Sequence, residues 1–480
     1  MEQESFSLES SKSTTRNKPQ KRQKRDEISH RLFHILRQPT SAMDSRYLQG
    51  MDQQKPLSRY TKLSPYLDTN ISHLVIGIAS SSKSLRSRKP YIKSWWIPNV
   101  TRGFIFLDRA PDKHLPWPSS MPPYRISEDT SRYNAFNMHK VRHVIRITRV
   151  IEELYNAENG DDVRWYVIAD DDTILFVNNI AKVLRKYDHN KYFYVGMPSE
   201  CIDSNALFSF NMAFGGAGYA LSYPLARLVA KNLDLCLKRY PTMYGSDQIM
   251  HSCIADLGVS LTLEKGFHQI DLHRDIFGLL SAHPQSLTLS LHHLDAVDSI
   301  FPSMNRIESV NHLMKAAKAD ESRLLQQTIC YEMHKKWTFS ISWGYSIQIY
   351  EAIIPPSILQ VPLETFSPIS RMLWPIYMFQ TRRVSNTSCE AAHVFFFNSI
   401  EETAGNHLET VYIRSSARGL PACSSRGNHS ADHISEIRVL APMRRDNVDR
   451  SRRECCDCMG MDIYSATLKL KSCSEVGILP

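Results

Sequence analysis

The stretch Arg164-Trp-Tyr-Val-Ile-Ala-Asp-Asp-Asp172 joins an apolar run to three consecutive carboxylates. Its first part predicts a strand buried on both faces, as the central strands of parallel sheets are. Asp170, Asp171 and Asp172 then stand at the carboxyl end of the strand, where α/β sheets bind ligands. Burying three carboxylates is costly without a cation, and Mg²⁺ and Mn²⁺ favour oxygen ligands. The stretch thus predicts an α/β fold with a metal site, although a solvated acidic loop or a helix N-cap remains open.

Strand-like and helix-like segments alternate around this stretch. Residues 73–79, 102–108 and 191–196 predict further strands, because each is a short apolar run bounded by polar or turn-forming residues. Helices are expected at 83–96, where Pro90 interrupts the pattern, and at 134–157, 177–187, 224–240 and 247–257. Such alternation is typical of βαβ units and a mostly parallel sheet.

Length and charge leave several function classes open. The chain has 480 residues, which allows two or three domains, or one large α/β domain with appendages. Lys and Arg number 58 and Asp and Glu 49, so the formal net charge is +9. This charge suits a phosphate-bearing ligand, nucleic acid or a membrane surface equally well. We rank nucleic acid last, because no stacking platform or finger motif accompanies the charge.

The two ends of the chain differ from its middle. Residues 1–72 predict a disordered basic tail, or else the cytosolic flank of a membrane anchor, because they are rich in Ser, Gln, Lys and Arg. No apolar run reaches about 18 residues, and the N-terminus shows no signal-peptide core. We expect a catalytic domain at 73–310, a small β-rich appendage at 311–400, and a Cys-rich, poorly ordered tail at 401–480.

Ten cysteines bear on the compartment in which the protein works. Six of them crowd the C-terminal part, which points to disulfides of a secretory compartment or, more weakly, to a zinc site. Four Asn-x-Ser/Thr sequons, at Asn70, Asn99, Asn386 and Asn428, lean toward the secretory pathway.

Two further segments are candidates for chemistry. The turn Phe214-Gly-Gly-Ala-Gly218 could bring backbone close to a ligand through Gly215, Gly216 and Gly218, or could be a tight turn. Asp247 opens a predicted helix. It could be an N-cap, or a general base that takes the proton of an acceptor hydroxyl.

Imidazoles and cations complete the candidate set. In His292-His293-Leu294-Asp295, one imidazole could complete a metal site, although paired histidines are more often structural. The basic residues that follow the first strand could face a diphosphate or could form a solvated helix face. They are Lys83, Arg86, Arg88 and Lys89.

Taken in order, these motifs resemble the Fringe-like glycosyltransferases (glycosyltransferase family 31-like). The likeness is greatest to the plant branch that carries a domain of unknown function, DUF604. Four segments look like that branch specifically, and the resemblance covers roughly residues 73–400. The segments are Gly266-Phe-His-Gln-Ile-Asp271, Phe277-Gly-Leu-Leu-Ser-Ala-His-Pro284, Ser290-Leu-His-His-Leu-Asp295 and Ser342-Trp-Gly-Tyr345.

The resemblance implies a GT-A fold (Rossmann-like, as in nucleotide-diphospho-sugar transferases), a UDP-sugar donor, Mn²⁺ or Mg²⁺, and inversion, often with a β1,3 linkage. By position, Asp172 and His293 look like metal ligands and Asp247 like the catalytic base. Asp170, Asp171, Arg88 and the three glycines would serve the nucleotide sugar.

Two departures from the family pattern matter. Members are normally Golgi type II membrane proteins, and this sequence shows no anchor. Ser246 stands where an acidic neighbour of the base is expected. The expected acceptor is a glycan, a protein-linked sugar or a cell-wall polysaccharide. A catalytically degenerate carbohydrate-binding protein is the alternative.

Overall fold

The computed structural model describes residues 69–133, 142–283, 286–373, 375–403, 405–424, 430–443 and 452–473. All of them belong to one compact unit, Ser64–Pro480. Most of the predicted N-terminal tail, the first part of the predicted helix at 134–157 and the sequon at Asn428 lie outside the described residues. Among the described residues, every helix is too short or too polar to cross a lipid bilayer.

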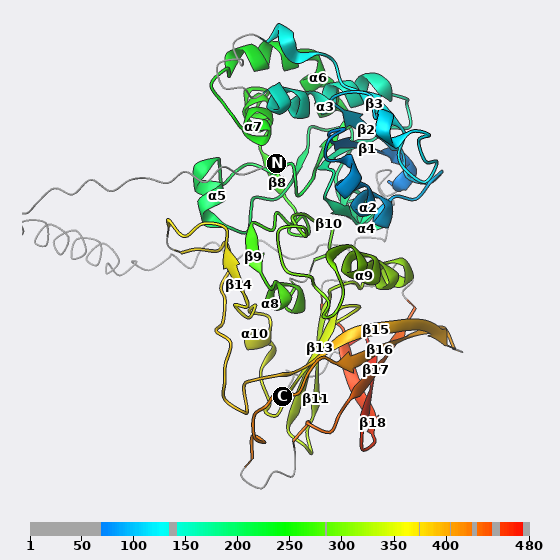
Figure 1. Cartoon of the computed structure of the whole chain (residues 1–480), viewed down its shortest axis with the longest axis vertical. Helices are drawn as coiled ribbons and strands as arrows, with labels where there is room; N and C mark the ends of the chain where they lie inside the picture. Colours follow the sequence, from blue (N-terminus) through cyan, green and yellow to red (C-terminus); the bar gives the residue numbers. More distant parts are fainter. Residues whose placement is uncertain are drawn as a thin grey trace, which may run out of the picture. The chain divides into compact units, whose positions relative to one another are not determined.

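The first half of the described chain forms a seven-stranded mixed sheet (Figure 1). Its strand order is β3-β2-β1-β4-β7-β6-β8. β7 runs antiparallel to its neighbours β4 and β6, and the other neighbours run parallel. The strands are β1 (Leu74–Ala79), β2 (Gly103–Leu107), β3 (Tyr124–Ile126), β4 (Trp165–Asp170), β6 (Tyr194–Gly196), β7 (Tyr219–Ser222) and β8 (Leu261–Leu263).

Helices cover both faces of this sheet (Figure 1). Alternate side chains of a strand point to opposite faces, so Ile76 of β1 joins one apolar cluster and Val75 the other. The first cluster includes α2 (Leu85–Trp95) and α4 (Val177–Leu184). The second includes α3 (Arg142–Ala157), α6 (Tyr223–Arg239) and α7 (Ser246–Asp256). The predicted α/β fold with a mostly parallel sheet is confirmed.

Gly77 in β1 shows why α3 can lie close to the sheet. A Cβ atom at this position would stand 2.9 Å from Leu154 and 3.0 Å from Val150, both on α3. The missing side chain thus lets the helix seat its apolar face directly on the strand.

Pro90 does not interrupt α2, in contrast to the prediction. The helix runs unbroken over Leu85–Trp95 with Pro90 inside it. Proline removes one intrahelical hydrogen bond. The next turn nevertheless remains helical, because Tyr91, Ile92 and Trp95 are buried there and their burial outweighs that loss.

The second half of the chain builds an eight-stranded sheet, of order β11-β12-β13-β15-β16-β17-β19-β18 (Figure 1). α9 (Arg306–Asp320) packs against both α2 and β15, so one apolar core runs through both sheets. The strands are β11 (Gln327–Glu332), β12 (Trp337–Ser342), β13 (Ser346–Tyr350), β15 (His393–Thr403), β16 (His407–Arg414), β17 (Glu436–Pro442), β18 (Cys455–Met461) and β19 (Ser465–Lys471).

This sheet corrects two predictions. The expected small appendage at 311–400 is wrong, because its boundary at 400 falls inside β15. The expected poorly ordered tail at 401–480 is wrong as well, since β16, β17 and β19 alternate buried and exposed residues. Their outward-facing Glu, Arg and Lys side chains make the composition polar and hide the period-two apolar pattern of half-buried strands.

The eight-stranded sheet curls so that its two edge strands, β11 and β18, lie against each other. A disulfide between Cys330 and Cys456 joins them. Three further disulfides are Cys236–Cys253, Cys389–Cys423 and Cys455–Cys473. Five of the six C-terminal cysteines therefore form disulfides rather than the alternative zinc site. Cys201 and Cys458 are free thiols.

Removing the Cys330–Cys456 disulfide is expected to lower the free energy of unfolding by about 4–5 kcal/mol, because long closed loops lose most entropy on cross-linking. The two cysteines are separated by 126 residues. Denaturant unfolding of a Cys330→Ser/Cys456→Ser variant measures this. The control is a Cys236→Ser/Cys253→Ser variant, which removes a disulfide between cysteines separated by only 17 residues. It should lose only roughly 3 kcal/mol. Equal losses would contradict the expectation.

Short elements tie the two halves together. β14 pairs with β9, and the backbone N–H groups of Met372 and Leu373 donate to Asp203 at the start of α5. The second half of the chain thus builds part of the wall beside the carboxyl ends of the first sheet. The short elements are β5 (Ile174–Leu175), β9 (Leu272–Arg274), β10 (Ser290–Leu291), β14 (Phe366–Pro368), α5 (Ile202–Leu207), α8 (Phe277–Ser281) and α10 (Pro356–Leu359).

Candidate active site

The loop that follows β4 carries the acidic triplet and is held rigidly from both sides. The Thr173 hydroxyl accepts a hydrogen bond from the Asp170 N–H at 3.2 Å and donates to the Gly216 carbonyl at 2.6 Å. The indole N–H of Trp95 donates to the Thr173 carbonyl at 2.9 Å. The loop is therefore fastened to α2 and to the glycine turn before any ligand binds.

Asp171 faces the start of α2. Its carboxylate accepts hydrogen bonds from the hydroxyls of Ser80, at 2.7 Å, and Ser84, at 3.0 Å. Burial, followed by the charge of Asp172, raises the pKa of Asp171. These short contacts with the protein give Asp171 a supporting position in the loop.

Asp172 is the most buried of the three acids, with only 6 % of its side chain exposed. One oxygen, Oδ2, lies 3.0 Å from the Arg88 guanidinium. The other, Oδ1, lies 3.1 Å from Nε2 of His292. Although burial opposes it, the His292 imidazole and the Arg88 guanidinium hold the pKa of Asp172 well below its usual range.

The hydrogen bonds of His292 indicate which of its two ring nitrogens carries a hydrogen. Nδ1 of His292 lies 3.0 Å from Oε1 of Gln269, and the other end of that amide donates to Asp271. Oε1 is therefore an acceptor, so Nδ1 carries a hydrogen, and in the neutral ring the lone pair is on Nε2. That lone pair points at the Asp172 carboxylate.

This pair of acceptors fits a divalent cation. Two cis ligands on an octahedral ion with bonds of roughly 2.1 Å lie about 3 Å apart, which is the spacing of Nε2 and Oδ1. Among the described residues, the only group of three potential ligands that converges in this way is Asp172, His292 and His293, with ligand atoms within 4.8 Å of one another. Carboxylate and imidazole together suit Mn²⁺ better than Mg²⁺.

His293 lies in the same cluster, and one of its ring nitrogens contacts Asp271. Its Nδ1 lies 3.1 Å from Asp271, and its backbone has φ of 69°, a conformation that few non-glycine residues adopt. Burial lowers the pKa of His293, but the bond and charge of Asp271 outweigh it and the net shift is upward. His293 therefore reaches the cluster only through its second nitrogen.

Asp170 stands at the open side of the cluster. Its side chain is 35 % exposed and lies 3.9 Å from Nε2 of His292. Burial by the surrounding protein and the charges of Asp172 and Asp247 raise its pKa well above the usual value. A bound cation would offset the repulsion between these carboxylates, as expected for an acid next to a metal site.

Asp247 lies at the start of α7, against the glycine turn. The Gly215 N–H and the Ser246 hydroxyl, the latter at 3.3 Å, donate to its carboxylate. Burial nonetheless raises the pKa of Asp247. A carboxylate whose pKa is raised toward neutrality is suited to accept a proton.

The glycine turn makes room for these side chains. A Cβ atom at Gly215 would stand 2.4 Å from Oδ1 of Asp247, and one at Gly216 would stand 2.1 Å from Cε1 of His292. Gly218 has φ of +88°, which glycine adopts without strain. The sequence predicts that a ligand approaches this turn closely. In the structure, the Asp247 carboxylate and the His292 imidazole of the protein itself lie there.

Replacing Gly216 by Ala is expected to weaken Mn²⁺ binding at least about tenfold, because the methyl group would displace the His292 ring. Calorimetric titration with MnCl₂ measures the change. Gly460→Ala is the matched control, because a Cβ atom there meets nothing within 4 Å. An unchanged Kd in Gly216→Ala would show that His292 does not hold the metal.

The structure gathers most of the predicted site residues, adds several, and leaves others out. Asp170–Asp172, Arg88, Gly215, Gly216, His293 and Asp247 lie together. Lys89 instead lies over the ring of Trp117, and Lys83 and Arg86 are exposed. Sequence reasoning preferred His293 to His292 and assigned no role to Ser80, Ser84 and Asp295. For Asp295 and Asp271, their presence in the quoted motifs was the available signal.

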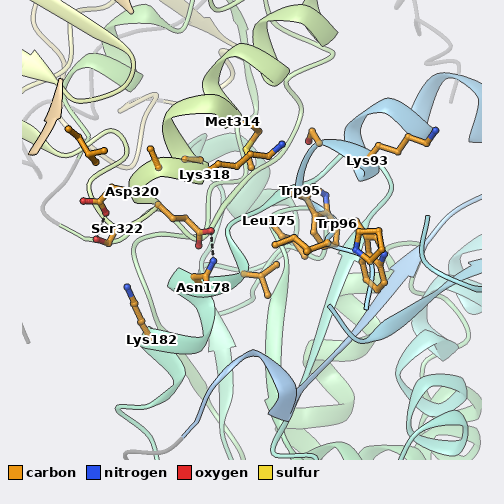
Figure 2. A pocket seen from close by; sticks show the side chains of 18 of the residues that line it. Lys93, Trp95, Trp96, Leu175, Asn178, Lys182, Met314, Lys318, Asp320 and Ser322 are labelled. Carbon is orange, nitrogen blue, oxygen red and sulfur yellow. Dashed lines mark hydrogen bonds between the residues drawn. The ribbon is translucent and has the colours of Figure 1, made fainter. Parts of the chain in front are cut away.

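A pocket of about 620 Å³ lies between α2, α4 and α9, and the acidic triplet, Arg88, His292, His293 and Asp247 do not line it (Figure 2). Trp95, Trp96 and Leu175 form one side, and α9 contributes Met314 and Lys318 on the other. Trp95 thus lines the pocket and also holds the acidic loop through Thr173.

Sheet order, acidic loop and carboxylate–imidazole cluster together define an α/β domain with a candidate metal site at the carboxyl ends of its strands. The model of a family described as "Protein of unknown function, DUF604" matches residues 204–456, more than half of the chain. The chain belongs to this family.

Two further proteins are similar to parts of the chain. The Beta-1,3-N-acetylglucosaminyltransferase lunatic fringe of Xenopus laevis is 26 % identical over 174 residues, covering 34 % of this chain and 43 % of that protein. The chain thus spans less than half of the length of this relative. The core-mannan synthase A of Aspergillus fumigatus, in its Mn/GDP form, matches 40 % of this chain and 73 % of its own at 8 % identity. Its TM-score of 0.27 is too low to establish a shared fold.

Proposed function

We propose that this protein is an inverting, UDP-sugar-dependent glycosyltransferase that requires Mn²⁺. The spacing of 3.1 Å between Asp172 Oδ1 and His292 Nε2 carries the proposal, because a carboxylate and a neutral imidazole at that spacing can act as neighbouring ligands of one divalent ion. The similarity to a β-1,3-N-acetylglucosaminyltransferase supports it and favours a β1,3 linkage.

Asp172, His292 and His293 are the residues that would hold the metal, with Asp170 beside them. When bound, a divalent cation neutralises the charge that develops on the departing diphosphate. Arg88, with a guanidinium that can bind two phosphate oxygens, would add a second positive charge on the same side. Asp171 would keep the loop in place through Ser80 and Ser84.

Asp247 would act as the general base. The acceptor hydroxyl oxygen forms the new glycosidic bond, its proton passes to the Asp247 carboxylate, and the bond between the sugar and UDP breaks with inversion at the anomeric carbon. Asp247 contacts Gly215 and His292 contacts Gly216. Base and metal-side imidazole thus lie against consecutive residues of one turn, which suits a single reaction centre.

The compartment that suits this chemistry is the Golgi lumen. Four disulfides among the described residues suit an oxidising compartment rather than the cytosol. The sequon asparagines Asn99 and Asn386 are exposed, as glycosylated asparagines must be. We expect the acceptor to be a glycan, a glycoprotein sugar or a cell-wall polysaccharide.

A donor screen tests the proposal. The full chain is incubated with a panel of UDP-sugars and Mn²⁺, and released UDP is measured with and without candidate acceptors. We expect release with at least one UDP-sugar and its loss with chelator. Undiminished turnover in both Asp172→Ala and Asp247→Ala would overturn the proposal. Binding of UDP and Mn²⁺ without transfer to any acceptor would instead favour a degenerate, carbohydrate-binding protein.

A further inference from the structure

Asp172 is shared between two positive partners. Its Oδ2 contacts Arg88 at 3.0 Å, and its Oδ1 faces His292 and the candidate metal position. Among the described residues, Arg88 is the only Lys or Arg within ion-pair distance of the acidic triplet. Arg88 and the candidate metal would thus both contact the same nearly buried carboxylate, that of Asp172.

Arg88 has a second partner outside the triplet. Its Nη1 donates to Oδ2 of Asp295, and this contact is shorter than the one with Asp172. Asp295 follows His293 in the chain, so one short stretch carries both imidazoles and this carboxylate. The Asp295 side chain is 32 % exposed, against 6 % for Asp172, so it lies nearer the solvent.

We propose that Arg88 and the metal compete for Asp172, and that Asp295 is a positioning residue that holds Arg88 away from Asp172 when the metal binds. The inference rests on the metal site of the proposed function. Before metal binding, Arg88 supplies the positive charge that the buried acids need. After it, Arg88 stays on Asp295 with guanidinium N–H groups left for the donor's diphosphate.

This arrangement predicts effects of opposite sign on two ligands. Removing the Arg88 charge with Arg88→Met should tighten Mn²⁺ binding about tenfold, since a charge about 5 Å away repels the ion appreciably even at an effective dielectric constant near 20. The same variant should weaken UDP binding in saturating Mn²⁺ about tenfold, because a charge-assisted phosphate contact is lost. A residue with a merely structural role would weaken both.

Asp295→Asn should weaken Mn²⁺ binding about fivefold, because Arg88 then turns fully to Asp172. In the Arg88→Met background the same change should have a much smaller effect, and this double-mutant cycle isolates the action of Asp295 through Arg88. Arg86→Met is the matched control. Arg86 carries the same charge on the same helix but is exposed, and it makes no ion pair with any residue that the structure describes.

Mn²⁺ affinity is measured on the full chain by electron paramagnetic resonance of the free ion, and UDP affinity by calorimetry. Thermal melting checks that each variant is folded. Tighter Mn²⁺ binding with weaker UDP binding in Arg88→Met supports the inference. Unchanged or weaker Mn²⁺ binding in Arg88→Met, or equal effects of Asp295→Asn in both backgrounds, overturns the inference alone. Absence of Mn²⁺ binding in the unaltered chain would instead overturn the proposed metal site, and the inference with it.

Discussion

Asp247→Asn is expected to lower kcat about 10²–10⁴-fold, the range that general-base catalysis contributes. The amide keeps the shape of the side chain but cannot take the acceptor's proton. Mn²⁺ and UDP affinities should stay close to those of the unaltered protein, because Asp247 belongs to neither set of contacts.

The measurement is a UDP-release assay at saturating donor, with Mn²⁺ titration alongside. Asp256→Asn is the control, since Asp256 ends the same helix and pairs with Arg239 at 2.6 Å. A kcat within threefold of the control would remove Asp247 from the chemistry.

The raised pKa of Asp247 adds a pH signature. The base works as the carboxylate, so kcat should fall as pH falls through a pKa that lies above the ordinary value near 3.8. Asp247→Asn should lack this acidic limb. Stability has the opposite sign, because a carboxyl group with a raised folded pKa favours folding when protonated. We therefore expect Asp247→Asn to have a higher free energy of unfolding near neutral pH.

Asp172→Asn is the second large effect. It should weaken Mn²⁺ binding roughly 100-fold or more, because the amide removes an anionic ligand from a metal that requires it. His292→Ala should have a similar effect. His293→Ala should also weaken binding, by about tenfold or more, because the bond of its Nδ1 to Asp271 leaves the other ring nitrogen for the metal.

Calorimetric titration with MnCl₂ ranks these variants, with His273→Ala as the control on the neighbouring strand β9. The order distinguishes two assignments. If His293→Ala lost more affinity than His292→Ala, the metal would lie on the His293 side of Asp172, and the tautomer argument for His292 would be wrong.

Local sequence signals predicted four of the seven strands of the first sheet, β1, β2, β4 and β6, but not β3, β7 and β8. Trp165–Asp170 forms β4 because each of its first five residues is buried, and an uninterrupted apolar run is what such a strand needs. The helices were harder to bound. Pro90 predicts an interruption from local propensity alone, whereas the burial of Tyr91 and Trp95 against distant parts of the chain keeps α2 helical.

The candidate site could be predicted in its residues but not in its contacts. Asp172, Asp247 and His293 were identified from motif order. That His292 joins His293 in the cluster could not be predicted from sequence, because it depends on Gln269, which orients the His292 ring, and on Asp271, which orients the His293 ring. Similarly, Gly215 and Gly216 give no local indication that a carboxylate and an imidazole from distant segments lie against them.

The position of β19 has a consequence for synthesis. This strand is the last along the described chain, yet it lies inside the sheet between β17 and β18. β18 can join β17 only through β19, so a nascent chain keeps an open sheet edge until β19 emerges. The Cys330–Cys456 bond, which needs β18 in place against β11, should therefore form only after β19 has been synthesised.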